Sequence, residues 1–336
     1  MTSGRQFLAI VGCGAACLLG TAATAQTNTP IPASQIPDLV VPTNGINLGS
    51  TSFYDGFSNL NPGVTLLQYV RYSDFDSITD SKGNESAAFQ QPQINVVTSI
   101  TQLSVATPLA IGGNRIGFDV LVPVTRIDSR FGAGGLQLRD NGTAIGDVTF
   151  GPFIQFKPVM RGPRPIASVR LAVNVIAPTG GFDRSRDLNQ GSGYWSVNAY
   201  AAWTLLPAPG WEVSGRTQYL YNARTSKIAN APDIPGFVFR NGQAGQLAYS
   251  NFTVSREVQR GVAVGLNGFV VQQLDNDRIN GIRLPDTKRS ALYMGPGLHL
   301  DRLPGWGMNA NLLLPVSTRN YSNGPQLNLQ FILPLR

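Results

Sequence analysis

Residues 193–222 have the sequence GYWSVNAYAAWTLLPAPGWEVSGRTQYLYN, which consists of two alternating runs separated by the turn residues 207–210. In both runs the odd positions are mainly apolar or aromatic. The even positions carry most of the polar groups, among them Ser196, Asn198, Glu212 and Arg216. A period of two predicts β-strands with one apolar and one polar face, and the Pro-Gly turn between them predicts a hairpin.

The large aromatic residues of this hairpin stand near both ends of its apolar face. Trp195 and Trp203 are eight residues apart, which corresponds to about 20 Å of height for strands tilted as in membrane barrels. Trp211 and Tyr219 repeat this spacing on the second strand, and Tyr221 extends it. Two aromatic bands that flank an apolar middle are typical of a transmembrane barrel. We therefore predict an aromatic girdle formed by these five residues.

The composition agrees with a single large β domain. Charged residues make up 13% of the 336 residues, and 37 Gly and 23 Pro supply turn residues. The formal net charge of +7 would suit nucleic acid or an anionic surface. Because the chain also carries a predicted export signal, lipopolysaccharide is the expected anionic partner, and no nucleic acid is expected.

The N-terminus carries the pattern of a secretory signal. Residues 1–25 combine a positive start at Arg5, an apolar run, and small residues before the expected cleavage point after Ala25. Both cysteines, Cys13 and Cys17, fall inside this signal, so the sequence predicts neither a disulfide nor a thiolate site in the mature protein. Residues 26–62 show no sustained period. They are compatible with a periplasmic tail, a plug folded into the barrel, or an extra strand.

The remaining residues, 63–336, contain twelve runs typical of β-strands. These are expected to begin near residues 64, 93, 114, 144, 165, 193, 211, 245, 261, 287, 306 and 325. Their connections alternate between short turns with Pro or Gly and long polar loops. This pattern predicts an all-β, antiparallel up-and-down barrel of about 12 transmembrane strands, with short periplasmic turns and long extracellular loops.

The polar faces of these strands supply the residues expected to line the lumen. The candidates are Arg115, Asp119, Asp147, Lys157, Arg170, Asn174, Glu212 and Arg216. Their charges are mixed rather than of one sign. They either form pairs that fill a narrow lumen or form a polar constriction that orients a solute.

The sequence offers no convincing catalytic constellation. The one histidine, His299, falls on the predicted inner face near the periplasmic end, whereas a lipid hydrolase needs its base at the outer rim on the lipid side, next to a serine. With one His and no Cys in the predicted mature chain, neither a metal site nor a cofactor is expected. The acidic stretch Asp275–Asp277 is best interpreted as a solvated loop. We therefore predict a protein that is not an enzyme.

Several stretches resemble one family of bacterial outer-membrane proteins. They are Pro62-Gly63 with Tyr69 and Tyr72, Ala177-Pro178-Thr179-Gly180, Phe182-Asp183, Asn189, Gly191, Gly193-Tyr194-Trp195, Gly210-Trp211, residues 219–222 and 268–275, and Gly295-Pro296. The family is the outer-membrane β-barrel family named for the meta-pathway of phenol degradation. The resemblance covers most of the predicted mature chain and implies a transporter for hydrophobic or aromatic compounds.

Three hypotheses for function follow. The first is an outer-membrane channel, porin-like in architecture, that admits a small hydrophobic or aromatic solute by passive diffusion. The second is a non-transporting structural or surface-binding barrel, and the third, an outer-membrane lipid hydrolase, is the weakest. All three imply contact with outer-membrane lipid and lipopolysaccharide, and with the barrel-assembly machinery during biogenesis.

Overall fold

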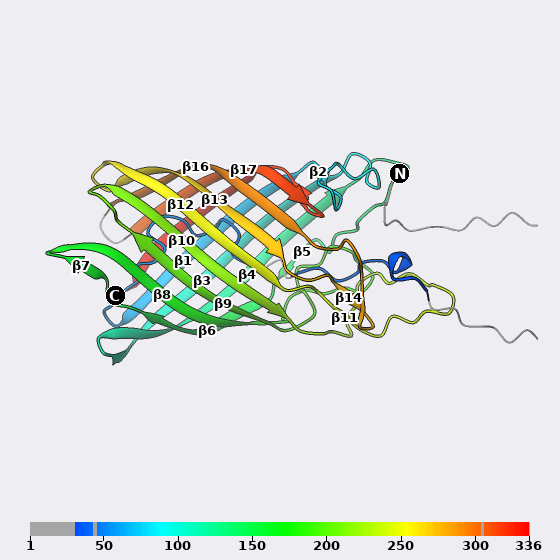
Figure 1. Cartoon of the computed structure of the whole chain (residues 1–336), viewed down its shortest axis with the longest axis horizontal. Coiled ribbons are helices and arrows are strands. Elements are labelled where there is room, and N and C mark those ends of the chain that lie inside the picture. Colours follow the sequence, from blue (N-terminus) through cyan, green and yellow to red (C-terminus); the bar gives the residue numbers. More distant parts are fainter. Residues whose placement is uncertain (1–30, 43–45, 304–305, 336) are drawn as a thin grey trace, which may run out of the picture.

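The computed structural model describes residues 31–42, 46–303 and 306–335, and its main feature is a closed antiparallel β-barrel (Figure 1). Within these residues the wall contains twelve long strands: β1 (Gly63–Phe75), β3 (Gln93–Ile111), β4 (Asn114–Arg130), β6 (Val148–Gln155), β8 (Arg164–Ala177), β9 (Ser196–Leu205), β10 (Trp211–Asn222), β12 (Leu247–Gln259), β13 (Val262–Gln273), β16 (Ser290–Leu303), β17 (Trp306–Arg319) and β19 (Gln326–Leu335). Neighbouring wall strands pair in chain order, and β1 closes the ring on β19, from Val64 opposite Leu335 to Ser73 opposite Gln326. The prediction of a 12-stranded up-and-down barrel is confirmed.

Short elements lie mostly in the long connections at one end of the barrel, which we call the loop end. They are the 3-10 helix η1 (Ala33–Gln35) and the strands β2 (Ser77–Ile78), β5 (Thr143–Ile145), β11 (Gly242–Gln243), β14 (Arg278–Ile279), β15 (Ile282–Arg283) and β18 (Ser322–Asn323). The opposite end, which we call the turn end, carries the short turns, β7 (Val159–Arg161) and the C-terminus (Figure 1). Among the described residues, no helix is long and apolar enough to cross a membrane. The predicted signal, residues 1–25, falls outside the described residues.

The expected strand starts agree with the observed ones to within a few residues, and the largest difference is at β6. The sequence pattern suggests a start near Ala144, whereas β6 begins at Val148. The chain first pairs with β4 as β5, and then Gly146 N donates to Pro123 O at 2.9 Å. Because Pro123 has no N–H to return to the ladder, pairing is interrupted at this point and resumes in β6.

The two faces of the wall have opposite chemistry. On β8, Leu171 and Val173 are 41% and 49% exposed on the outside, whereas Arg170 and Asn174 point inward and are buried. Many inward positions of the other strands are Ser, Thr, Asn or Gln, and an apolar cluster that includes Leu220, Phe269 and Leu313 lies among them. Apolar side chains outside and polar side chains inside are the pattern of a barrel that is surrounded by lipid.

The sequence pattern of β1 and β12 favours neither face, and the structure assigns both strands. On β1 the odd positions point inward, with Tyr69 and Ser73 buried and Tyr72 exposed outside. On β12 the odd positions also point inward, with Asn251 and Thr253 buried.

The outward position of Leu171 leads to a testable prediction. Leu171→Arg should destabilise the barrel by about 2–4 kcal/mol, the cost of an arginine near the bilayer midplane. Leu171→Met keeps volume and apolarity and should cost less than about 1.5 kcal/mol. Reversible folding into lipid vesicles measures both variants, and equal costs would show that this face of β8 does not meet lipid.

Candidate functional site

The lumen of the barrel is occupied by residues 46–60, which we call the internal segment. It enters among the long loops and leaves near the short turns (Figure 1). Gly49 N donates to Asn251 Oδ1 of β12 at 2.9 Å. At the turn end, Arg115 Nε of β4 donates to Leu60 O at 2.6 Å. The segment therefore spans most of the lumen before the chain begins β1.

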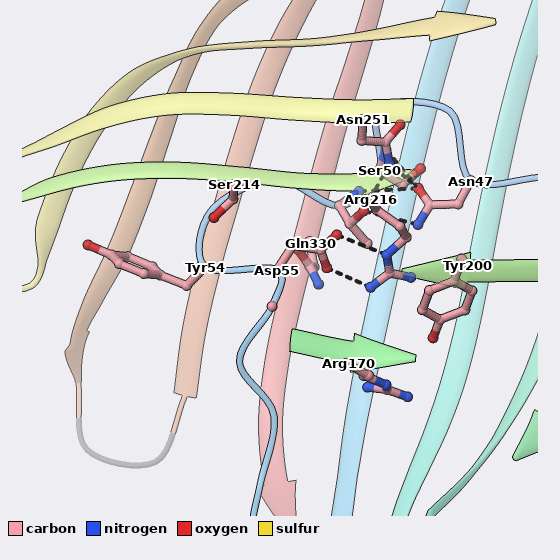
Figure 2. A network of polar contacts seen from close by, with 12 residues as sticks. Asn47, Ser50, Tyr54, Asp55, Arg170, Tyr200, Ser214, Arg216, Asn251 and Gln330 are labelled. Atoms are coloured by element: carbon pink, nitrogen blue, oxygen red, sulfur yellow. Dashed lines mark hydrogen bonds and ion pairs between the residues drawn. The ribbon is translucent and has the colours of Figure 1, made fainter. Parts of the chain in front are cut away.

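A tight loop at residues 47–51 forms the first anchor (Figure 2). Asn47 Oδ1 accepts hydrogen bonds from Ser50 N and Thr51 N, both at 3.2 Å. Asn251 Nδ2 donates to Asn47 Oδ1 at 3.1 Å and to Thr51 Oγ1 at 2.9 Å. Gly49 has φ +75°, and a Cβ there would lie 2.4 Å from the Leu313 side chain. The loop is thus held by side-chain bonds and not by pairing with a wall strand.

A buried ion pair forms the second anchor (Figure 2). Arg216 of β10 donates from Nε to Asp55 Oδ2 at 2.9 Å and from a terminal nitrogen to Asp55 Oδ1 at 2.5 Å. The two side chains are 12% and 8% exposed, and the guanidinium carbon lies 4.5 Å from the centre of the Tyr200 ring. This two-point contact fixes both the position and the orientation of Asp55.

The Glu212 carboxylate of β10 organises a third anchor. It accepts hydrogen bonds from Tyr54 N of the internal segment, from Ser214 Oγ at 2.5 Å and from Ser255 Oγ at 2.5 Å. Glu212 is 1% exposed. Three donors satisfy a carboxylate that would otherwise be costly to bury.

At Gly56 the backbone of the internal segment lies directly against the wall. Gly56 N donates to Thr204 Oγ1 at 2.9 Å, and Gly56 O accepts from Ser168 Oγ at 2.8 Å and Gln155 Nε2 at 3.0 Å. A Cβ on Gly56 would lie 2.4 Å from Thr204 N and 2.5 Å from Ser168 O. Only glycine permits this approach, because both neighbours are backbone atoms.

Residues 31–42 are packed among the long connections at the loop end. Ile36 and Val40 are 1% and 4% exposed in an apolar cluster with side chains of the long loops. Arg289 donates to Asp38 at 2.7 Å and to Asp277 at 2.6 Å. Burial, and secondly the neighbouring Asp277, raise the pKa of the Asp38 carboxyl well above its usual range, and Arg289 opposes the rise. The chain therefore approaches the lumen from the loop end.

The predicted lumen residues fall into distinct settings. Glu212, Arg216 and Arg115 contact the internal segment, as described above. Arg170 forms a buried ion pair with Asp119 of β4, and its guanidinium lies 3.7 Å from the centre of the Phe153 ring. These inward charges are thus largely paired with one another or with the segment.

The other three candidates differ from this set. Asn174 is buried on the inner face of β8. Asp147 accepts hydrogen bonds from Gly180 N at 2.9 Å and from Ser192 N at 2.8 Å, so it organises a long loop. Lys157 is exposed at the turn end beside Gly113. The structure does not bring these three into one group with the segment's anchors.

The five aromatic residues of the expected girdle lie on the outer face of β9 and β10 or next to it. Trp195, Trp211, Tyr219 and Tyr221 are 42–53% exposed. Trp203 is partly covered because its ring packs over Gly215 of β10. Trp195 stands toward the loop end of this hairpin, and Trp211 stands beside its short turn.

Sequence reasoning missed the residues that anchor the internal segment from its own side. Asn47, Asp55 and Gly56 stand in a stretch without period, and no spacing in that stretch signals their partners. The interpretation of residues 275–277 as a solvated loop is wrong for Asp277, which is 0% exposed because Arg289 and Gly245 N bind it.

His299 also contacts the internal segment. Its ring centre lies 5.6 Å from that of Phe53 and 5.2 Å from that of Tyr54, and Nδ1 is 2.7 Å from Asn309 Oδ1. Within the described part of the chain, no group of three or more His, Cys, Asp or Glu side chains is placed to hold a metal ion.

Comparison with known proteins gives two findings. The model of the family described as "Putative MetA-pathway of phenol degradation" matches residues 75–331. Among solved structures, the COG4313 outer membrane channel from Pseudomonas putida F1 superposes with a TM-score of 0.69 at 16% identity, over 84% of this chain and 98% of that chain. No curated protein matches the sequence.

Other solved barrels are less similar. The translocator domain of the autotransporter NalP from Neisseria meningitidis has a TM-score of 0.46 at 10% identity, over 82% of this chain and 89% of that chain. The beta domain of the Bordetella autotransporter BrkA has a TM-score of 0.47 at 10% identity, over 82% and 100%. The family model covers most of the barrel, so the chain belongs to the family described as the putative MetA-pathway of phenol degradation and has the fold of an outer-membrane channel.

Proposed function

We propose that this protein is an outer-membrane channel that admits small hydrophobic or aromatic compounds by passive diffusion. The observation that carries the proposal is a wide barrel whose lumen is filled by a separate segment and not by the wall itself. Side chains of an eight-stranded barrel fill its interior, whereas twelve strands leave more room. The internal segment takes up that room through side-chain contacts, which can be broken without opening the barrel.

Membership in a family named for phenol degradation supports an aromatic solute, and the polar, mixed-charge contacts around the segment do not favour a wide aqueous pore. We further propose export by the predicted signal, assembly by the barrel-assembly machinery, contact with lipopolysaccharide, and a non-enzymatic role. In the orientation that we propose for the outer membrane, the long loops face the outside of the cell. A tag at Asn276 should then be labelled on intact cells, and labelling only after the outer membrane is broken would reverse the orientation.

The alternative is a structural or surface-binding barrel that never transports. The occupied lumen also favours this alternative if the internal segment stays in place throughout the life of the protein. Solute flux separates the two proposals.

A flux measurement tests the channel directly. Vesicles containing the purified full chain should take up a neutral aromatic such as toluene faster than vesicles that contain an unrelated barrel, which report passive leakage through lipid. A sugar should move little faster than in that control, because the segment occupies the lumen. If neither solute enters faster than it enters the control vesicles, and removal of residues 26–62 does not change this result, the non-transporting barrel is the better description.

A further inference from the structure

A cavity of about 430 Å³ lies on the outer surface of the barrel at the loop end. Its lining includes one row of wall residues, because Gln272 of β13 pairs with Ser290 of β16, and Ser290 pairs with Arg319 of β17. Residues directly opposite each other on antiparallel strands share a face. Gln272 is exposed between the buried residues Val271 and Gln273, so the row faces outward. The cavity is therefore separate from the lumen and from the internal segment.

This row of polar residues lies where the apolar outer face of the wall ends. On β13, outward Val270 is 42% exposed, and the next outward residue is Gln272. On β17, Val316 is 55% exposed, and Arg319 follows three residues later. Two residues of a strand span about 7 Å, so the change is abrupt. In a membrane barrel such a change marks the level where acyl chains give way to lipid head groups.

Two cations line the cavity. They are Arg319 and Lys288, which stands in the loop between β15 and β16. Both side chains are exposed, and within the part of the chain that the structure describes neither forms a hydrogen bond or an ion pair. Ser81 and Ser290 add hydroxyl groups to the same lining. The cavity thus presents two available cations and neutral donors to a ligand at head-group level.

The rest of the lining limits which anion the cavity can bind. Asp286 contributes a carboxylate, so two cations and one carboxylate leave a charge of +1. Pro285 and Asn276 complete the lining, and the Asn276 amide already donates to a loop carbonyl at 2.6 Å. A ligand must gain more from the two cations than it loses to Asp286. A phosphate monoester suits this lining, because it carries about −1.5 to −2 charges and three acceptor oxygens.

We propose that this cavity binds a phosphate monoester of lipid A, the phosphorylated glycolipid anchor of lipopolysaccharide, between Lys288 and Arg319. The acyl chains of the same lipid then cover the apolar wall next to the cavity. A free phosphate ion has the same charge but gains nothing from that wall, so the lipid should bind more tightly. The proposal deepens the proposed contact with lipopolysaccharide and rests on the proposed function for its orientation, in which the loop end meets the outer leaflet.

Native mass spectrometry of the purified full chain in detergent tests the site, because it counts the lipid molecules bound to each barrel. An ionic strength of about 0.15 M screens exposed charges that are more than about 8 Å apart. The wild type should bind lipid A more tightly than phosphatidylglycerol, whose phosphodiester carries one charge, and more tightly than dephosphorylated lipid A. Inorganic phosphate should compete only at concentrations far above that of the lipid.

Three substitutions at the cavity should act in two directions. Lys288→Gln and Arg319→Gln should each weaken lipid A binding about tenfold, because each removes a charge-assisted hydrogen bond. Asp286→Asn should strengthen it about two- to fivefold, because it removes the repelling carboxylate from an exposed site. Arg224→Gln is the matched control, since Arg224 is an exposed cation at the loop end of β10 that does not line the cavity. Heat-modified mobility on gels reports whether each variant folds.

Four results would overturn the site. They are equal binding of lipid A and its dephosphorylated form, unchanged binding by both cation variants, equal losses in the Arg224 control, and displacement of lipid A by inorganic phosphate at the concentration of the lipid. The last result would show a site for a free anion. Lipid A binding without aromatic flux would instead refute the channel and leave the site in place, and flux without lipid A binding would do the reverse.

Discussion

Gly56→Val should release the internal segment from the wall and turn an occluded barrel into an open, water-filled channel. The added Cβ would lie within 2.6 Å of three backbone atoms of Ser168, Trp203 and Thr204, and strand backbone cannot move aside as a flexible side chain can. The segment must therefore lift away and lose the hydrogen bonds of Gly56. Each bond left unmade in a buried site costs about 1–3 kcal/mol, and every 1.4 kcal/mol changes the docked population about tenfold.

Single-channel currents in planar bilayers measure this effect, together with swelling of vesicles in sugar solutions. Gly63→Val is the matched control, because a Cβ on Gly63 meets only the Asn59 side chain at 3.7 Å. Both variants should show the same heat-modified mobility if the barrel itself is intact. A Gly56→Val barrel with wild-type conductance would show that occupation of the lumen by this segment does not limit flow.

The wall of the barrel could be predicted from the sequence because the alternation that defines each strand involves residues that are adjacent in the chain. A strand that separates lipid from the lumen must alternate, so the pattern of residues such as Arg170 and Leu171 on β8 already fixes which side each faces. The prediction weakened where both faces of a strand are mixed. On β12, Ser250 faces outward while Phe252 and Asn251 occupy opposite sides, so no single parity stands out.

The contents of the lumen could not be predicted in the same way, because their contacts are distant in the sequence. Gly56 and Thr204 are 148 residues apart, and Ser50 and Asn328 are 278 residues apart. The internal segment has no period, since each residue meets a different strand of a closed ring. An aspartate such as Asp55 in a polar stretch resembles a solvated residue until the arginine that pairs with it is known.

The sequence could name the inward charges but not their partners. Arg216 and Glu212 were identified as inward from their parity, and both bind the internal segment. The alternation of residues also places Asp147 on the inner face, yet its carboxylate binds the backbone N–H of Gly180 in a long loop. The alternation along a strand assigns each side chain to the inner or the outer face of the barrel. Its binding partner depends on how the loops and the internal segment fold over the barrel.

The second large effect concerns the ion pair between Asp55 and Arg216. Asp55→Ala leaves a buried guanidinium without its carboxylate, which should weaken docking of the internal segment by about 3–5 kcal/mol. The double variant Asp55→Ala with Arg216→Met removes both charges and replaces the guanidinium with an apolar chain. The double variant should recover most of the lost docking free energy, because replacing a buried ion pair with apolar side chains often leaves the stability unchanged.

The rate of thiol modification at a single cysteine measures this docking. Both native cysteines lie in the predicted signal, so Ser50→Cys would give the mature chain one thiol at a site that is 4% exposed while the segment is docked. In this background Asp55→Ala should speed maleimide labelling by roughly 150- to 4,000-fold, the equivalent of its cost in free energy, and the double variant should return within about tenfold of the parent. Equal acceleration by the single and double variants would mean that Asp55 holds the segment by packing and not by charge. An unchanged rate in both would mean that the other anchors, at Asn47 and Gly56, hold it without help from the ion pair.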